Sequence, residues 1–312
     1  MWNGCTPSKK PGSASNSNVW KTLTLPSKIE SPSEFEKSVL VIREAYTGSG
    51  GDRRFLNLMY NFLGWLVGDA GKNFSNKRPW ARVELGLSRK HPQNLQLGNF
   101  VMSCISLLGM TCGRIRDSSP RSRDPHGAYR WMPYFSEVFV WFHTACMGLD
   151  RDQLTSYDSV RMDWLLTASS DSIKWFLRGI ADSDGTVNVR NKVVAITSEP
   201  NGPLFVKLFA MVGVHATIHK SKGFDCVSIS VSDAVRIRIF NPEMETHRGV
   251  LLEKLASAQT FQARWPFWLE ERVRSLLADH PDLSTVRNIL LFEDDTYVKL
   301  KTLKTKLARM VD

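Results

Sequence analysis

Two nine-residue segments of the sequence, Phe62–Ala70 and Leu177–Gly185, match each other in pattern. Both have glycine in the third position and aspartate in the eighth, and these aspartates are Asp69 and Asp184. After each segment the hydrophobic pattern predicts a similar series of short strands and helices. An internal repeat restricts a chain to an architecture built from two copies of one unit. The duplication therefore constrains the fold more than any other feature of the sequence.

The first repeat is expected within residues 52–155 and the second within residues 165–255. Asp52 is a suitable N-cap for the opening helix of the first repeat, and Ser169 or Ser170 for that of the second. Before the repeats, residues 1–51 are expected to form a loose arm and a short helix. After them, residues 256–312 are expected to form a C-terminal helical extension with a basic end.

The composition excludes membrane-spanning proteins and proteins built on disulfides or zinc sites. No apolar run reaches the length of about 18 to 20 residues that a membrane span needs. The five cysteines show no C-x-x-C spacing, so neither a disulfide framework nor a zinc site is expected. We therefore expect an intracellular protein of a reducing compartment, with no membrane partner.

The charge of the chain points to a polyanionic partner. The formal net charge is +10 and the pI is about 9.4, which favours nucleic acid over membrane. Residues 71–130 hold eleven Lys or Arg and three acidic residues, and residues 185–240 repeat this bias more weakly. Basic residues two apart share a face of a strand, although for any single pair a solvated surface is the more ordinary interpretation. The candidate nucleic-acid contacts are Arg82, Arg89, Arg114, Arg116, Arg121, Arg123, Arg130, Arg190, Lys192, Lys220 and Lys222.

Small residues spaced four apart lie on one face of each motif helix: Gly64 with Gly68, and Gly179 with Ser183. They allow the two helices to approach backbone to backbone, so that each helix ends in an aspartate beside that of the other repeat. Two such carboxylates repel each other and lie at the negative ends of two helix dipoles. A divalent cation such as Mg²⁺, or Mn²⁺ in its place, is therefore expected between them. Either aspartate alone has an ordinary alternative role as a helix terminator.

The paired segments resemble the duplicated signature of the LAGLIDADG homing endonucleases, and the second copy is the closer match. The first copy has Val67 where the family has its first acid and Ala70 in place of the final glycine. The resemblance covers residues 52–255. It implies a fold of class α+β, a pseudo-two-fold pair of αββαββα units whose antiparallel sheets form a DNA-binding saddle. It also implies a monomer that makes metal-dependent double-strand breaks at a long, specific DNA target during intron homing.

The resemblance further implies a set of site residues. The metal site would consist of Asp69, Asp184, Gly68, Ala70 and Ser183, with the two aspartates as catalytic acids. The family usually adds basic or polar side chains that organise water. In the first repeat Lys90 is the best candidate and His91 the second, although a plain surface lysine or a phosphate contact suits Lys90 equally. The matching second-repeat segment, residues 196–200, has no basic residue, which leaves this role to Lys192 or Lys220.

Two other functions fit the same sequence. An RNA-binding maturase that helps its host intron to fold would use the same scaffold and basic surface, with intron RNA as its partner. A non-catalytic DNA-binding protein would also use this surface. The eighth-position acids in both copies favour retained cleavage, because a pure splicing cofactor has no need of them. The expected function is therefore that of an intron-encoded DNA endonuclease.

Overall fold

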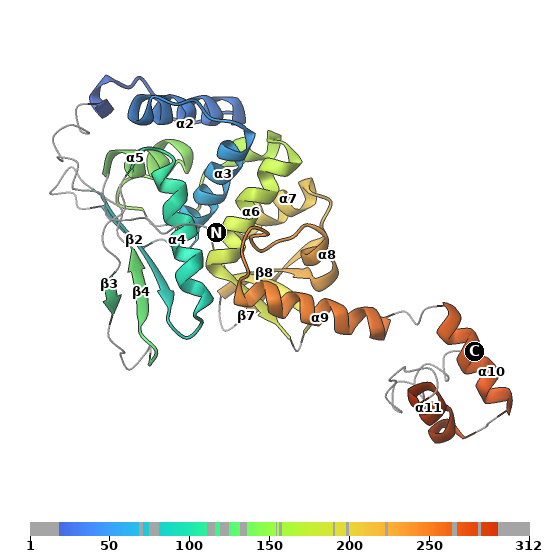
Figure 1. The fold of residues 1–312 in the computed structure, drawn as a ribbon. Coiled ribbons are helices and arrows are strands. Elements are labelled where there is room, and N and C mark those ends of the chain that lie inside the picture. The colour runs from blue at the N-terminus through green and yellow to red at the C-terminus, as the bar shows by residue number, and fades with distance from the viewer. Residues whose placement is uncertain are drawn as a thin grey trace. The chain divides into compact units, whose positions relative to one another are not determined.

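The computed structural model describes residues 19–68, 71–74, 81–110, 116–118, 125–131, 136–153, 155, 158–189, 191–197, 200–221, 224–263, 267–279 and 282–292 (Figure 1). The chain divides into two compact units, one up to Glu253 and one from Lys254 onward. The first unit holds both repeats and combines helices with antiparallel sheets, which is the expected α+β class.

Each repeat contains a four-stranded antiparallel sheet, and the two sheets have equivalent strand orders. The first sheet has the order β1-β2-β4-β3, with β1 at Gly71–Phe74, β2 at Ala81–Ser88, β3 at Arg116–Ser118 and β4 at Ala128–Trp131. The second has the order β5-β6-β8-β7, with β5 at Gly185–Asn188, β6 at Val193–Thr197, β7 at Ala216–Ser221 and β8 at Phe224–Ser230. In both repeats the second and third strands are joined through a helix, which is α4 (Gln93–Ser106) or α7 (Gly202–Met211). The duplication expected from the sequence is therefore present in the fold.

The two motif helices are α3 (Arg53–Val67) and α6 (Ser170–Asp184). Their N-caps are those expected: Asp52 accepts the N–H of Phe55 at 2.8 Å, and Ser169 accepts the N–H of Ser172 at 3.1 Å. Almost every residue of both helices is buried, and Figure 1 shows them side by side in the middle of the first unit. Helices that are buried on all sides form the centre of a core.

Alternation along the strands separates a helix-covered face from an open face in each sheet. In the first sheet Leu85, Leu87 and Trp131 are buried, and the Trp131 ring packs closely against Gly98 of α4. In the second sheet the buried set is Val194, Ile196, Val227 and Ile229. The helices therefore cover one face of each sheet and leave the other face uncovered among the described residues.

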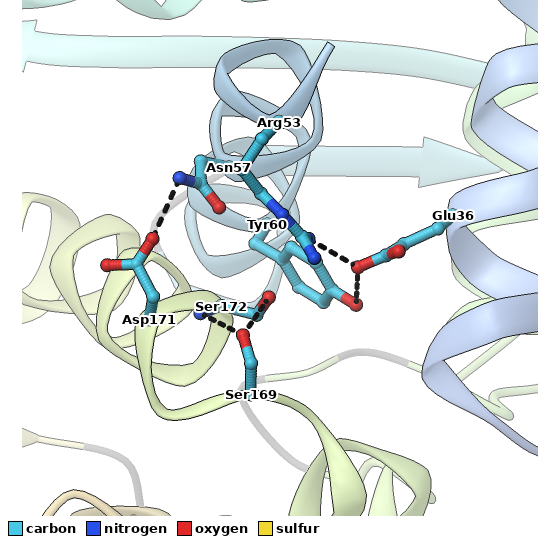
Figure 2. A network of polar contacts seen from close by, with 7 residues as sticks. All are labelled: Glu36, Arg53, Asn57, Tyr60, Ser169, Asp171 and Ser172. Carbon is cyan, nitrogen blue, oxygen red and sulfur yellow. Dashed lines mark hydrogen bonds and ion pairs between the residues drawn. The ribbon is translucent and has the colours of Figure 1, made fainter. Parts of the chain in front are cut away.

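A polar network links the beginnings of α3 and α6 to α2 (Pro32–Thr47), as Figure 2 shows. Glu36 of α2 accepts hydrogen bonds from Arg53 at 2.8 Å and from the Tyr60 hydroxyl at 3.2 Å. Burial, reinforced by Glu36, raises the pKa of the Tyr60 hydroxyl, which therefore stays protonated as a donor. Between the motif helices, the amide of Asn57 donates to Asp171 at 2.9 Å. These contacts fix the end of the helix pair that is opposite the motif aspartates.

Each duplicated unit closes with a helix after its fourth strand. After the fourth strands come α5 (Ser136–Trp141), which continues as a π-helical turn over Phe142–Cys146, and α8 (Val231–Arg236). The chain then forms α9 (His247–Ala263), α10 (Phe267–Asp279) and α11 (Leu283–Phe292). In the second unit α10 and α11 share a small core of Val273, Leu276, Val286 and Leu290. None of the described helices is long and apolar enough to cross a membrane.

Candidate active site and nucleic-acid interface

The motif helices run parallel and are in backbone contact at their glycines. A methyl group at Gly64 would overlap the carbonyl oxygen of Phe176 and lie 3.1 Å from the Cα of Gly179. A methyl group at Gly179 would overlap the carbonyl oxygen of Asn61. The same Asn61 uses its side-chain amide to donate to the carbonyl of Trp175 at 3.2 Å. Only glycine at both positions permits this approach, and we call the contact between α3 and α6 the glycine seam.

The glycine seam leads directly to Asp184. At its end, a methyl group on Gly68 would overlap the Ser183 hydroxyl and lie 3.2 Å from Oδ2 of Asp184. Gly68 is the residue before Asp69, which with Ala70 lies outside the described residues. The structure thus places the Asp184 carboxylate beside Gly68, the residue that precedes Asp69 in the chain.

The carbonyls in the last turn of α6 are held by Arg248, a residue of α9. Its guanidinium donates to the backbone oxygens of Ala181 and Asp182. The Asp182 side chain is 1% exposed and accepts the N–H of Asn241 at 3.2 Å. Burial raises the pKa of Asp182 to about 7, against the opposing effects of the Asn241 N–H and of the charges on Arg248 and Arg178. Asp182, the first of the two acids in the second motif, is therefore a buried structural group. Asp184, two residues later, reaches a less buried position.

A cavity of about 100 Å³ lies beside this helix end. Two of the residues that line it, His91 and His247, stack their imidazoles directly on each other, with ring centroids 3.9 Å apart and an angle of 13° between the rings. Burial lowers the pKa of His91, and so do the charges of His247, Lys90, Arg248 and His126. The lining residues are His91, Asn94, Leu97, Asp182, Thr246, His247 and Arg248. The β2–α4 loop of the first repeat thus meets the end of the second motif helix through His91.

Lys90 precedes this histidine and occupies an exposed turn after β2. Its backbone N–H donates to the hydroxyl of Ser88 at 3.3 Å. Of the two first-repeat candidates for a basic role, His91 is the one that lines the cavity at the end of α6.

The second-repeat lysines lie away from Asp184. Lys192 is exposed in the β5–β6 turn, with a φ of 55°. Since β5 begins at Gly185 and ends at Asn188, this turn is about 10 Å or more from Asp184 along the strand. Lys220 is in β7, three strand spacings or about 14 Å from β5. The geometry therefore supports neither lysine as a water-organising residue beside Asp184.

The open face of the first sheet is the more basic of the two. Backbone register places positions 82, 84, 86, 116 and 130 on this face, so one acidic position, Glu84, stands with three arginine positions. Arg130 pairs with Gly86 on one side and with Arg116 on the other. A methyl group at Gly86 would meet open space, in agreement with an uncovered face. Arg89 instead lies over the ring of Tyr129 at 5.5 Å. The candidates that fall outside the described residues are Arg114, Arg121, Arg123, Arg190 and Lys222.

The open face of the second sheet has no charged position among the described residues. Ile218 and Val227 lie near Gly202 of α7, which identifies the helix-covered face. Lys220 is two residues from Ile218 on the edge strand β7, so it lies on the same, helix-covered face. The open-face positions are Thr186, Asn188, Val193, Ala195, Thr197, Thr217, His219, Ser221, Phe224, Cys226, Ser228 and Ser230. The sequence did not indicate this neutral face, because its signal is the strand register and not a cluster of charges.

Comparisons with known proteins give a likeness of fold. No family model matches the sequence, and no curated protein matches it. Among solved structures, the homing endonuclease I-DmoI in complex with DNA and Mn is 15% identical, covers 58% of this chain and 94% of that chain, and has a TM-score of 0.42. The N-terminal LAGLIDADG domain of DUF199/WhiA is 12% identical, covers 69% and 94%, and has a TM-score of 0.39. Full-length DUF199/WhiA from Thermatoga maritima is 13% identical, covers 86% and 90%, and has a TM-score of 0.43.

Proposed function

We propose that this chain is a metal-dependent, site-specific DNA endonuclease of the LAGLIDADG homing type, intracellular and monomeric, which breaks both strands of a long target. The observation that carries the proposal is the end of the glycine seam. Asp184 Oδ2 lies 3.2 Å from the methyl position of Gly68, the residue before Asp69. Asp69 follows Gly68 directly in the chain, and two acids related by the duplication would serve two scissile phosphates on opposite strands.

The electrostatics of this point favour a hard cation. Both motif helices end here, and neither has a basic residue in its last turn. The negative dipole end of α3 therefore adds to the charge of the Asp184 carboxylate, whereas Arg248 of α9 offsets part of the dipole of α6 by donating to its last carbonyls. Within the described residues, no three His, Cys, Asp or Glu side chains come together as a metal cluster. Asp184 with water and phosphate oxygens fits Mg²⁺ or Mn²⁺, which are bound through few carboxylates and keep several waters.

The roles of the protein groups follow from their positions. A bound divalent cation would supply an activated water and neutralise charge at the scissile phosphate. Asp184 would hold the cation, with Asp69 in the equivalent role for the other strand. The open faces of the two sheets would lie along the DNA. On the first sheet, Arg130 and the arginines at positions 82 and 116 of the same face would attract the phosphates.

The test of this function is cleavage of a randomised duplex DNA library by the full-length protein in Mg²⁺, with sequencing of the cut ends. We expect one long preferred target. Asp184→Asn is expected to reduce cleavage by at least a hundredfold, which is about 2.7 kcal/mol of barrier, and to leave DNA affinity in Ca²⁺ nearly unchanged. Asp163→Asn is the matched control, because the Asp163 side chain is 79% exposed and lies outside both motif helices.

The two alternative functions predict different outcomes of the same experiment. Binding of one DNA sequence without a cut in Mg²⁺ or Mn²⁺ would identify a non-catalytic DNA-binding protein. Binding of structured intron RNA in preference to duplex DNA would identify a maturase. Full cleavage by Asp184→Asn would overturn the role given to the acids.

A further inference from the structure

The register of the two sheets defines which residues of the repeats are equivalent. Matching the two motif aspartates aligns Gly71 with Thr186, and their strand partners Glu84 and Ala195 then align as well. Following each ladder outward gives three equivalent pairs: Gly86 with Thr197, Arg130 with Cys226, and Arg116 with His219. The row that carries two arginines in the first sheet therefore carries a thiol and an imidazole in the second.

His219 is exposed on the open face of the second sheet, and it is oriented by a neighbouring strand. The Ser228 hydroxyl lies 3.4 Å from Nδ1 of His219, within hydrogen-bond distance. Ser228 is itself 6% exposed, so its hydroxyl is a fixed partner. With Nδ1 engaged, Nε2 is the ring nitrogen that can donate to, or accept from, a ligand on this face.

The surroundings of His219 on the open face are uncharged and include several hydroxyl groups. Thr217 is two residues away on the same strand, and Thr197 lies across β8 with its hydroxyl 3.5 Å from the Cys226 sulfur. Among the described residues, the positions of this face include no Lys, Arg, Asp or Glu. A surface of hydroxyl and imidazole groups offers hydrogen bonds at defined points but little attraction for phosphate.

We propose that the two sheets contact DNA by different means: the first sheet supplies the cationic grip, and the neutral open face of the second sheet reads base edges, with His219 as its main specificity-determining residue. This inference rests on the proposed DNA-binding function. In the major groove each base pair presents a distinct set of donors and acceptors, which a fixed imidazole nitrogen can distinguish. Loss of a base contact changes sequence preference at one place, whereas loss of a phosphate contact weakens all sequences and lowers the salt dependence.

The experiment uses the full-length protein and binding in Ca²⁺, so that it does not depend on cleavage. The preferred target is first selected from the randomised duplex library. His219→Ala is then compared with the wild type on all single-base variants of that target. We expect the preference at one or two adjacent base pairs to fall by about five- to 150-fold, on one half of the target only. His215→Ala is the matched control, since His215 is an exposed histidine outside the strands of this face.

The salt dependence of affinity provides the second measurement. Arg130→Gln is expected to reduce the slope of log affinity against log salt by about one, whereas His219→Ala in alkaline buffer leaves the slope unchanged. Ser228→Ala is expected to give a smaller change in preference at the same base pairs as His219→Ala, because the imidazole loses its orienting partner.

The possible failures are distinguishable. A wild-type protein that selects no duplex target overturns the proposed function together with this inference. A clear target whose every base preference survives His219→Ala overturns this inference alone. A slope that falls equally in His219→Ala and Arg130→Gln also overturns it, because His219 would then act as a phosphate contact.

Discussion

The glycine seam makes a strong prediction about stability. Alanine in place of Gly179 introduces one carbon, which would overlap the carbonyl oxygen of Asn61 and lie 3.0 Å from the Cα of Gly64. Both neighbours are backbone atoms of a buried helix, so neither can move away as a flexible side chain would. The helices must separate, and the seam loses contact along its length.

The magnitude follows from three effects. Overpacking against rigid backbone costs up to about 3 kcal/mol. Separation of the helices also weakens the hydrogen bond from Asn61 to the Trp175 carbonyl, which contributes about 1 kcal/mol. Alanine recovers about 1 kcal/mol through its better helix propensity. We therefore expect Gly179→Ala to lower the free energy of unfolding by about 3 kcal/mol, or roughly 6 to 12 °C in Tm for a unit of this size.

Thermal unfolding of Gly179→Ala, Gly64→Ala and the double variant measures this effect. The double variant should lose less than the sum of the single variants, because one separation of the helices relieves both overlaps. Gly202→Ala is the control, since a methyl group there would lie 3.4 Å from its nearest neighbour, an ordinary contact. A Tm of Gly179→Ala within 2 °C of that of Gly202→Ala would refute the close packing.

Three further predictions concern caps and buried titratable groups. Asp52→Ala removes the acceptor of the Phe55 N–H and should cost about 1 kcal/mol, measured by denaturant unfolding against Asp52→Asn. The raised pKa of Asp182 means that the stability it contributes is full below about pH 4 and is lost as pH rises through about 7. Between about pH 4 and pH 7, the free energy of unfolding of Asp182→Asn should therefore rise relative to that of the wild type by on the order of 4 kcal/mol. Unfolding free energies that change with pH in parallel for the two proteins would contradict the assignment. For His91 the lowered pKa has the opposite sign: stability is full above about pH 6.5 and falls as pH falls, so His91→Phe should flatten the acid side of the Tm–pH profile.

Much of the first unit could be predicted from local sequence signals. Asp52 and Ser169 cap the motif helices because each is followed by a helical apolar pattern, and both caps are present. The strands of the second repeat follow the alternation of small apolar and polar residues closely. Helix α2 begins at Pro32, because the Ser31 hydroxyl accepts the N–H of Glu34 as its N-cap.

Other elements depend on contacts that a local pattern does not contain. Strand β1 has the polar sequence GKNF, which gives no alternation, and it forms by pairing with β2. The pattern from Ser232 to Phe240 predicts a helix, yet α8 ends at Arg236 and Arg238 has a φ of 50°. The carbonyls of Ile237 and Arg238 accept hydrogen bonds from Arg178 of α6, which stabilises this ending.

The candidate site shows the same division between local and distant signals. The glycine spacing predicts the approach of α3 and α6, since residues four apart share a helix face. Arg248 and His247, in contrast, reach the end of α6 from a helix more than sixty positions later, and no motif marks them. The face of the sheet on which a strand residue lies depends on register, and for this reason Lys220 entered the basic set while His219 did not.

The two repeats have diverged in complementary directions. The first has the looser motif, with Val67 and Ala70 at two signature positions, but it holds most of the excess charge in residues 71–130. The second has the closer motif and a neutral open face. Counterion release depends on the total number of phosphates neutralised, so one basic half can supply most of the affinity for a duplex. Base recognition cannot be shared between the halves in this way, because each half of an asymmetric target must be contacted by the sheet that lies over it. A duplicated chain can therefore give up charge on one sheet and place a hydrogen-bonding side chain there instead, which is the arrangement at His219, the equivalent of Arg116.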